Sequence, residues 1–213
     1  MRIFSYESRF SQVLLKLSYS CWLNVLWFLC SIPIITIGAS TAALYSVTLK
    51  IAADRETGIT KEFFQAFREN FPQATRLWLC SLLLGIALAA DLVLVTRLRS
   101  SSTGPAAAFW TLILALLIGA VVLFVITLTY LFPLIAYFRN DDVSMVKNAF
   151  LTGTRYLFST ILIFAIHFAM FYLIVSVFTP FAIFGEGLCA MLSSFLIINV
   201  FRVLSQNSQE KAS

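Results

Sequence analysis

The chain has 213 residues, of which 60% are hydrophobic and only 12% are charged, and its mean hydropathy is +0.91. Because a soluble domain carries about 25% charged residues, this composition excludes an ordinary soluble protein. The excess of apolar residues requires contact with lipid and predicts an integral membrane protein. The net charge of +5 comes from basic residues scattered between apolar runs, which argues against a nucleic-acid-binding stripe.

The first apolar block runs from about Val13 to Ile51 and is interrupted by Pro33 and Gly38. Pro33 lacks an N–H group and Gly38 supplies backbone freedom, so we expect a helix break at these residues. Each half of the block is shorter than the ~20 residues of a straight span. Two short spans, a re-entrant hairpin and one long kinked helix are the three competing interpretations.

The polar segment that follows contains a phenylalanine stripe from Ile59 to Phe71. Its apolar residues cover one face of a helix and its charged residues cover the other, which predicts an amphipathic helix over 59–71 in the membrane interface. Pro72 is expected to end this helix or to set its angle to the next span. This helix is also the candidate surface for a protein partner, formed by Phe63, Phe64, Phe67, Arg68 and Phe71.

The predicted fold is all-α, a polytopic transmembrane helix bundle that forms a single domain over residues 1–204. A polar cytoplasmic tail follows over 205–213. We expect six spans, at about 13–34, 39–53, 77–96, 106–138, 156–179 and 187–204.

Orientation follows from the distribution of lysine and arginine, which are concentrated in cytoplasmic loops of membrane proteins. With six spans and both termini in the cytoplasm, all 15 Lys and Arg residues lie inside except Arg97 and Arg99. A single span in the first block would move Arg2, Arg9 and Lys16 outside. The charge distribution therefore favours six spans with cytoplasmic N and C termini.

The only histidine, His167, lies near the middle of the fifth predicted span. An ionisable side chain within the membrane is a functional candidate as a proton relay or ligand. A neutral imidazole bonded to a neighbouring helix is the simpler interpretation, because no acidic residue lies three or four positions away. Glu186, between two glycines, is expected to be a solvated charge in an outer loop.

Three further polar residues lie within predicted spans. Asp91 either pairs with Arg97 or Arg99 near the outer face or contacts a polar solute. Asn24 and Asn199 are expected to form interhelical hydrogen bonds. Together with His167, these residues are the candidates for a polar path through the membrane.

Motifs for catalysis are absent from the sequence. It contains no Gly-rich phosphate loop, H-E-x-x-H or G-x-S-x-G, and a lone histidine leaves no dyad to activate a nucleophile. The cysteines form no C-x-x-C pair and show no metal-ligand spacing, which indicates buried thiols. We therefore predict a non-enzymatic protein with no catalytic, cofactor-binding or metal-binding residues.

The first apolar block also carries a family resemblance. Asn24-Val25-Leu26-Trp27, Ile32-Pro33, Thr36-Ile37-Gly38 and Ala42-Ala43-Leu44-Tyr45 resemble the N-terminal signature of the YesL-like bacterial integral membrane proteins. The stripe from Phe63 to Phe71 continues the similarity, which covers roughly residues 10 to 80. Ala39 departs from the pattern, since a proline is common there.

The YesL-like family has no assigned biochemical activity, so the resemblance implies a location and a context. It implies the bacterial cytoplasmic membrane and an association with carbohydrate uptake and polysaccharide use. The leading hypothesis is therefore a non-enzymatic accessory to sugar uptake. Its expected partners are the lipid bilayer and either subunits of an ABC importer or another cytoplasmic or membrane protein. A small transporter or permease subunit of an ABC-type sugar importer is the alternative, and a structural envelope protein is the third hypothesis.

Overall fold

The computed structural model describes residues 9–55, 58–177 and 185–210, and every element in these ranges is a helix. The elements are α1 (Arg9–Ser31), the 3-10 turn η1 (Ile34–Thr36), α2 (Ile37–Ala52), α3 (Ile59–Ser101), α4 (Pro105–Tyr137), α5 (Asp142–Arg155), α6 (Leu157–Tyr172), the π-helical segment η2 (Leu173–Val177) and α7 (Gly185–Glu210). Within the described ranges, six helices are long and apolar enough to cross a membrane, namely α1, α2, α3, α4, α6 with η2, and α7. The prediction of an all-α, multi-pass membrane protein is confirmed.

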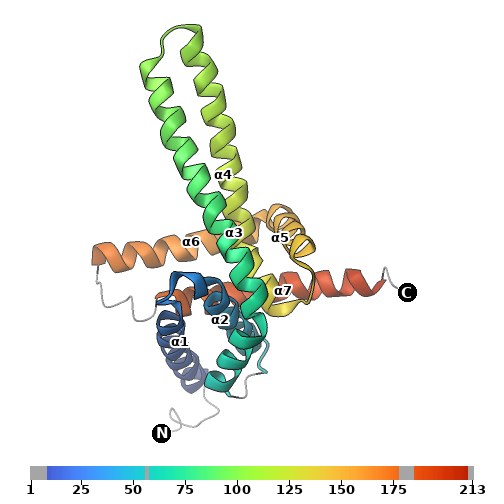
Figure 1. Cartoon of the computed structure of the whole chain (residues 1–213). Coiled ribbons are helices and arrows are strands. Elements are labelled where there is room, and N and C mark those ends of the chain that lie inside the picture. The colour runs from blue at the N-terminus through green and yellow to red at the C-terminus, as the bar shows by residue number, and fades with distance from the viewer. Residues whose placement is uncertain (1–8, 56–57, 178–184, 211–213) are drawn as a thin grey trace.

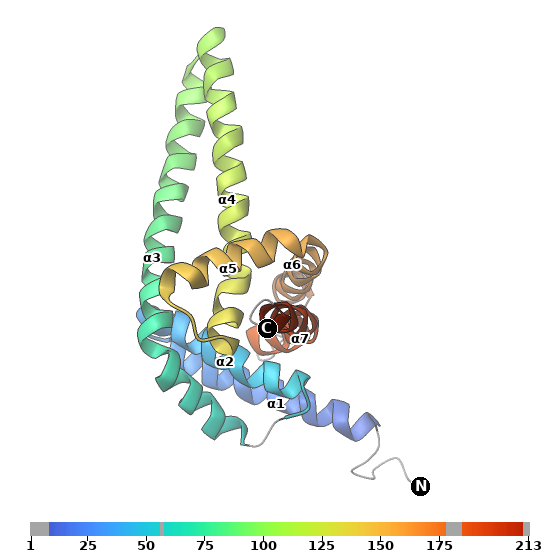
Figure 2. The ribbon, with the colours of Figure 1, turned by 90° about the vertical axis from the view of Figure 1, so that its right-hand side faces the viewer.

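The helices form two parts of different shape (Figure 1). α3 and α4 pair as a long antiparallel hairpin that projects from a body made of the other helices. In Figures 1 and 2, α6 and α7 run across the long axis of this hairpin. The hairpin therefore does not share its axis direction with α6 and α7.

The core of the body is built on α2 and α7. In their most apolar 18-residue windows, 67% of the α2 residues and 56% of the α7 residues are buried, against 6% in α3 and in α4. α2 packs closely because one stretch of it is made of the small residues Ala39, Ser40, Ala42 and Ala43, all fully buried. Such a helix is surrounded by protein on most sides.

α1 and α2 form an antiparallel helical hairpin. Lys16, near the start of α1, contacts Asp54 just beyond the end of α2, with Nζ and Oδ1 3.0 Å apart. Trp27 Nε1 in α1 donates to Thr41 Oγ1 in α2 at 3.1 Å. These contacts rule out one long kinked helix, because the two ends of such a helix would lie far apart. Two short spans and a re-entrant hairpin both fit this geometry.

Three backbone carbonyls at the break between α1 and α2 accept side-chain hydrogen bonds. The Thr36 hydroxyl donates to the carbonyls of Cys30 and Pro33, at 2.6 and 2.7 Å. Trp78 Nε1 of α3 donates to the carbonyl of Ile34 at 2.8 Å. Because an unpaired backbone group in a lipid environment costs several kcal/mol, these bonds allow a tight turn within an apolar segment.

Gly38 does not act as a break residue, contrary to the sequence-based interpretation. It lies in the first turn of α2, after the break has ended. A Cβ atom at Gly38 would lie 2.5 Å from Trp78 Cβ and 2.6 Å from the carbonyl oxygen of Ala74. Glycine is therefore required because α3 approaches this point closely, and the break itself belongs to Pro33 and η1.

The predicted amphipathic helix over 59–71 is the first part of α3, which continues through Pro72 to Ser101. Pro72 therefore does not end the helix, although it removes one backbone donor. Figure 2 shows this first part of α3 slanting away from the direction of the rest of the helix. Of the two predictions for Pro72, a change of helix direction fits the structure and a helix end does not.

The C-terminal end of the bundle extends further than predicted. α7 runs to Glu210, so the first residues of the expected polar tail at 205–213 are helical. The Ser205 hydroxyl donates to the carbonyl of Arg202 at 2.8 Å, within this helical extension. Residues 178 and 179 of the predicted fifth span and residues 211–213 of the tail lie outside the described residues.

Candidate functional site

His167 of α6 contacts Glu186 of α7 inside the body of the protein. His167 Nε2 and Glu186 Oε1 are 3.8 Å apart, and the two side chains are only 34% and 26% exposed. The expectation that Glu186 is a solvated loop charge is wrong, because α7 begins at Gly185 and places Glu186 in its first turn. A carboxylate is favourable there, since the N-terminal end of a helix carries a partial positive charge.

The hydrogen bond of His167 determines which ring nitrogen faces Glu186. His167 Nδ1 lies 2.9 Å from the carbonyl oxygen of Ile163, so Nδ1 carries a hydrogen and donates it. In a neutral ring Nε2 would then present a lone pair to the Glu186 carboxylate. A second proton, on Nε2 or on the carboxyl group, would remove this repulsion, so the arrangement of His167 and Glu186 favours binding of one proton.

A cavity of about 280 Å³ lies beside the pair. It is lined by Thr41, Tyr45, Val125, Leu128, Thr129, Phe132, Ile163, Phe164, His167 and Glu186. These residues come from α2, α4, α6 and α7, so four helices line the space. A mostly apolar wall with a few polar groups directed inward is the usual composition of a small-molecule site.

Asn24 fixes the start of α7 and therefore the position of Glu186. Its Oδ1 accepts a hydrogen bond from the backbone N–H of Gly187 at 3.0 Å, across 163 positions in the chain. A Cβ atom at Gly187 would clash with the backbone carbonyl oxygen of Ser20. α1 and α7 thus touch at their backbones, and Asn24 satisfies one of the donors left unpaired at the end of α7.

The other two residues of the predicted polar path lie elsewhere. Asp91 is exposed on the α3–α4 hairpin, and its carboxylate forms no ion pair or hydrogen bond within residues 9–55, 58–177 and 185–210. The predicted pairing with Arg97 or Arg99 is therefore wrong, and Arg99 Nε instead donates to Thr111 Oγ1 at 3.0 Å. Asn199 is exposed on α7 and donates to the carbonyl of Phe195 in its own helix, so it does not join another helix.

The predicted partner surface on the first part of α3 is only partly available. Phe63 is fully buried in the core, and Phe67 packs against that core from its edge. Phe64, Arg68 and Phe71 remain exposed. The apolar face of this helix therefore contacts protein, mainly α2, rather than lipid alone, and the exposed surface is narrower than the phenylalanine pattern indicates.

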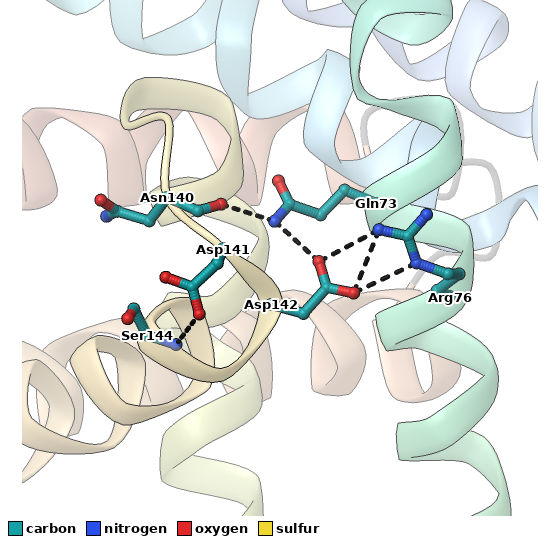
Figure 3. A network of polar contacts seen from close by, with 6 residues as sticks. All are labelled: Gln73, Arg76, Asn140, Asp141, Asp142 and Ser144. Carbon is teal, nitrogen blue, oxygen red and sulfur yellow. Dashed lines mark hydrogen bonds and ion pairs between the residues drawn. The ribbon is translucent and has the colours of Figure 1, made fainter.

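A polar network joins the first half of α3 to the loop before α5 (Figure 3). Gln73 Nε2 donates to the carbonyl of Asn140 at 2.8 Å and to Asp142 Oδ1 at 2.9 Å. Arg76 contacts both oxygens of the same carboxylate, with Nε at 3.1 Å from Oδ2 and Nη2 at 3.2 Å from Oδ1. The two polar segments that the charge distribution assigns to the cytoplasm are thus held together on one side of the molecule.

Two carboxylates beside this network are stabilised in their ionised form. Hydrogen bonds from Gln65, and then from Arg139 at 2.7 Å, lower the pKa of Glu69. The pKa of Asp141 is lowered because its side chain accepts from Ser144 as the N-cap of α5. Both groups are therefore charged at neutral pH and support the junction between α3 and α5.

Comparisons with known proteins add one match. The family model described as "Protein of unknown function, DUF624" matches residues 21–92. This segment begins within α1, holds Asn24 and all of α2, and ends at Leu92 in α3; it is consistent with the resemblance seen at Asn24–Tyr45. The comparison with curated proteins found no match, and neither did the comparison with solved structures.

The four cysteines and the acidic residues add no further site. Cys21, Cys30, Cys80 and Cys189 are all free thiols, and Cys80 is exposed rather than buried as expected. Within the described ranges, no group of three or more His, Cys, Asp or Glu side chains is placed to hold a metal ion. The His167–Glu186 pair with its cavity is the candidate site that the structure supports best.

Proposed function

We propose that this chain is a non-enzymatic membrane component of carbohydrate uptake that acts as a small transporter or permease subunit. In this proposal it lies in the bacterial cytoplasmic membrane with both termini inside. The observation that carries the proposal is the contact of His167 with Glu186 beside a cavity lined by four helices. Ionisable groups within membrane segments are expensive to place there, which favours a functional role over a structural one.

The chemistry of the cavity wall supports a solute with several hydroxyl groups. Thr41, Tyr45 and Thr129 supply hydroxyls, and Glu186 supplies a strong acceptor. The Thr41 hydroxyl already accepts from Trp27, so its own hydrogen is oriented away from that indole. Polar groups of this kind fix the orientation of a ligand, while the rings of Phe132 and Phe164 supply apolar contact.

The proton gives this site a means of coupling. When Glu186 is ionised, its carboxylate attracts a protonated His167. The carboxylate is then less available to accept a hydrogen bond from a solute hydroxyl. When the proton moves or leaves, both side chains change their hydrogen-bonding capacity at the cavity wall. Solute binding and proton binding are therefore linked in both directions, as thermodynamic coupling requires.

A binding experiment tests the site with purified protein in detergent. A panel of monosaccharides and disaccharides is added, and the melting temperature is recorded for wild type, Glu186→Gln and Asp91→Asn. At a ligand concentration of about 100 times Kd, the free energy of unfolding rises by about 2.7 kcal/mol, which shifts the melting temperature by several degrees. We expect at least one sugar to stabilise wild type and Asp91→Asn, and to lose this effect in Glu186→Gln.

Asp91→Asn is the matched control because it removes the same charge from an exposed position that forms no ion pair or hydrogen bond in the described part of the chain. Equal stabilisation of all three proteins would contradict the assignment of the site. Stabilisation of none of them by any sugar would contradict the proposed solute class.

A second candidate function is an accessory protein that docks to an importer subunit through the cytoplasmic side. The observation that favours it is the exposed set of Phe64, Arg68 and Phe71 on a segment of α3 that the network of Gln73, Arg76 and Asp142 holds in place. A photo-crosslinking residue at Phe64 should then capture an importer subunit in native membranes.

The adjacent residue Phe63 is the control for this crosslink, since it is fully buried and one position away on the same helix. We expect adducts with importer subunits at position 64 and none at position 63. Adducts with lipid alone at position 64 would contradict docking through this surface.

A further inference from the structure

A second cavity, of about 570 Å³, lies where the C-terminal ends of α2 and α4 meet the middle of α7. It is lined by Ser46, Leu49, Lys50, Ala53, Arg55, Ala136, Tyr137, Ile198 and Arg202. Three of these residues are cations and none is acidic. The cavity is separate from the His167–Glu186 site, because the two share no lining residue.

The positive charge of this cavity is only partly neutralised by the protein. Lys50 Nζ lies 3.2 Å from Glu62 Oε2, outside the cavity wall. The guanidinium groups of Arg55 and Arg202 form no ion pair with a carboxylate in the described part of the chain. Both arginines are exposed, so their charges are open to a ligand from outside.

Arginine is suited to one class of anion in particular. Its planar fork of N–H donors matches the oxygens of a phosphate group and binds them through two hydrogen bonds at once. The Tyr137 and Ser46 hydroxyls on the wall offer further donors to the same group. Leu49 and Ile198 add apolar surface beside the charges, which suits a phosphate attached to an organic group.

The position of the cavity in the membrane supports the same class. Lys50, Arg55 and Arg202 all belong to segments that the charge distribution assigns to the cytoplasmic side. The cytoplasmic leaflet is rich in anionic lipids, and basic pockets between membrane helices on that side bind their headgroups. Phosphorylated small molecules reach the same surface from the cytoplasm.

We propose that the cavity formed by Lys50, Arg55 and Arg202 binds a phosphate group, presented either by an anionic lipid headgroup or by a soluble phosphorylated compound. The bound phosphate neutralises three cations from α2, the segment after it, and α7. It therefore holds together the helices that form the core of the body. This inference is independent of the proposed transport function and of the solute bound at the other cavity.

The test uses full-length protein in a neutral detergent, with phosphatidylglycerol, phosphatidylcholine and inorganic pyrophosphate as three separate probes. Bound lipid is counted by native mass spectrometry, and pyrophosphate binding is measured by calorimetry. The variant is Arg55→Gln/Arg202→Gln, which keeps the Lys50–Glu62 contact. The matched control is Lys61→Gln/Lys147→Gln, which removes two exposed cations outside the cavity.

We expect wild type and control to bind an anionic probe and the arginine variant to bind it at least about tenfold more weakly. Retention of phosphatidylglycerol but not of pyrophosphate identifies a lipid headgroup as the source, and the opposite pattern identifies a soluble phosphate. Equal binding of the anionic probes by variant and control, or retention of phosphatidylcholine as strongly as phosphatidylglycerol, would overturn the proposal. A second variant, Arg55→Lys/Arg202→Lys, should restore part of the affinity if charge at these positions is responsible.

Discussion

The α3–α4 hairpin and the α2–α7 core are both apolar, yet they use their apolar residues in opposite ways. In their most apolar 18-residue windows, the hairpin helices have the highest hydropathy of the six candidate spans and only 6% of their residues are buried, whereas 67% of the window in α2 and 56% of the window in α7 are buried. The buried pair also holds the polar residues Ser40, Thr48, Ser193 and Ser194, all fully buried. High hydropathy here marks contact with lipid, and small or weakly polar residues mark contact between helices.

Substitution of a glycine is expected to give the largest difference in stability between a core variant and a hairpin variant. Gly38→Val should destabilise the protein by about 3 kcal/mol or prevent folding, because the added atoms meet the backbone oxygen of Ala74 and force α2 and α3 apart. Gly119→Val in α4 has no neighbouring atom within 4 Å of its new Cβ and should change the stability little. Thermal unfolding in detergent measures both variants.

Equal destabilisation by the two glycine variants would show that the hairpin is packed as tightly as the core. A stable Gly38→Val protein would show that α2 and α3 do not approach each other at this residue.

A smaller loss of stability is expected when the hydrogen bond between the two core helices is removed. The hydroxyls of Thr48 in α2 and Ser194 in α7 are 2.8 Å apart and buried. Thr48→Val should cost about 1 kcal/mol, because it removes this bond and leaves Ser194 without it. Thr127→Val in α4 removes only a bond to the carbonyl of Leu123 in the same helix, so its effect on unfolding should be close to zero.

The free energy of unfolding in detergent, from denaturant titration, compares Thr48→Val with Thr127→Val. A Thr127→Val protein that is less stable than Thr48→Val would contradict the role of the hydrogen bond between α2 and α7.

The junction between the hairpin and α5 should respond more weakly still. Arg76 and Asp142 are 62% and 36% exposed, and exposed ion pairs contribute about 0.5 kcal/mol. Asp142→Asn should therefore lower the stability by about this amount, and the loss should shrink in high salt. Asp91→Asn on the exposed part of the hairpin should have no measurable effect on unfolding.

The weakest expected effect is a pH dependence at Glu69. Its pKa is lowered in the folded protein, first by the Gln65 amide and then by Arg139. A lowered pKa means that the contribution of Glu69 is fully present above the ordinary glutamate range and is lost as the pH falls below about 4. Amide hydrogen exchange in the loop before α5 should therefore accelerate in acid, and in Gln65→Ala the change should begin at a higher pH.

Exchange rates in this loop that stay constant between neutral pH and pH 3, relative to the intrinsic rates, would contradict the role of Glu69. A change near pH 6 would point to a different group.

Local chemistry made much of the helical layout predictable from the sequence. The apolar runs, the polar loops and Pro33 locate the helices and the break between α1 and α2, since these features depend on residues close together in the chain. The path of α3 through Pro72 was less predictable, because packing against α2 supports a helix that proline alone would weaken.

The candidate site required information that local sequence does not contain. His167 and Glu186 lie on different helices, so a search for an acid three or four positions from the histidine could not find the pair. In the same way, the stripe of phenylalanines predicts an amphipathic helix, but only the position of α2 decides that Phe63 faces the core and Phe64 faces outward. The glycines on both sides of Glu186 were the available signal, since Gly187 marks a close contact with α1.

The most direct test of the account measures sugar uptake into proteoliposomes under an imposed proton gradient. Radiolabelled sugars from the panel above serve as probes, and wild type is compared with Glu186→Gln and Asp91→Asn. The account predicts gradient-driven uptake by wild type and Asp91→Asn, with a loss of at least about tenfold in Glu186→Gln, equivalent to 1.4 kcal/mol or more. Loss of uptake in Asp91→Asn with full uptake in Glu186→Gln would contradict it.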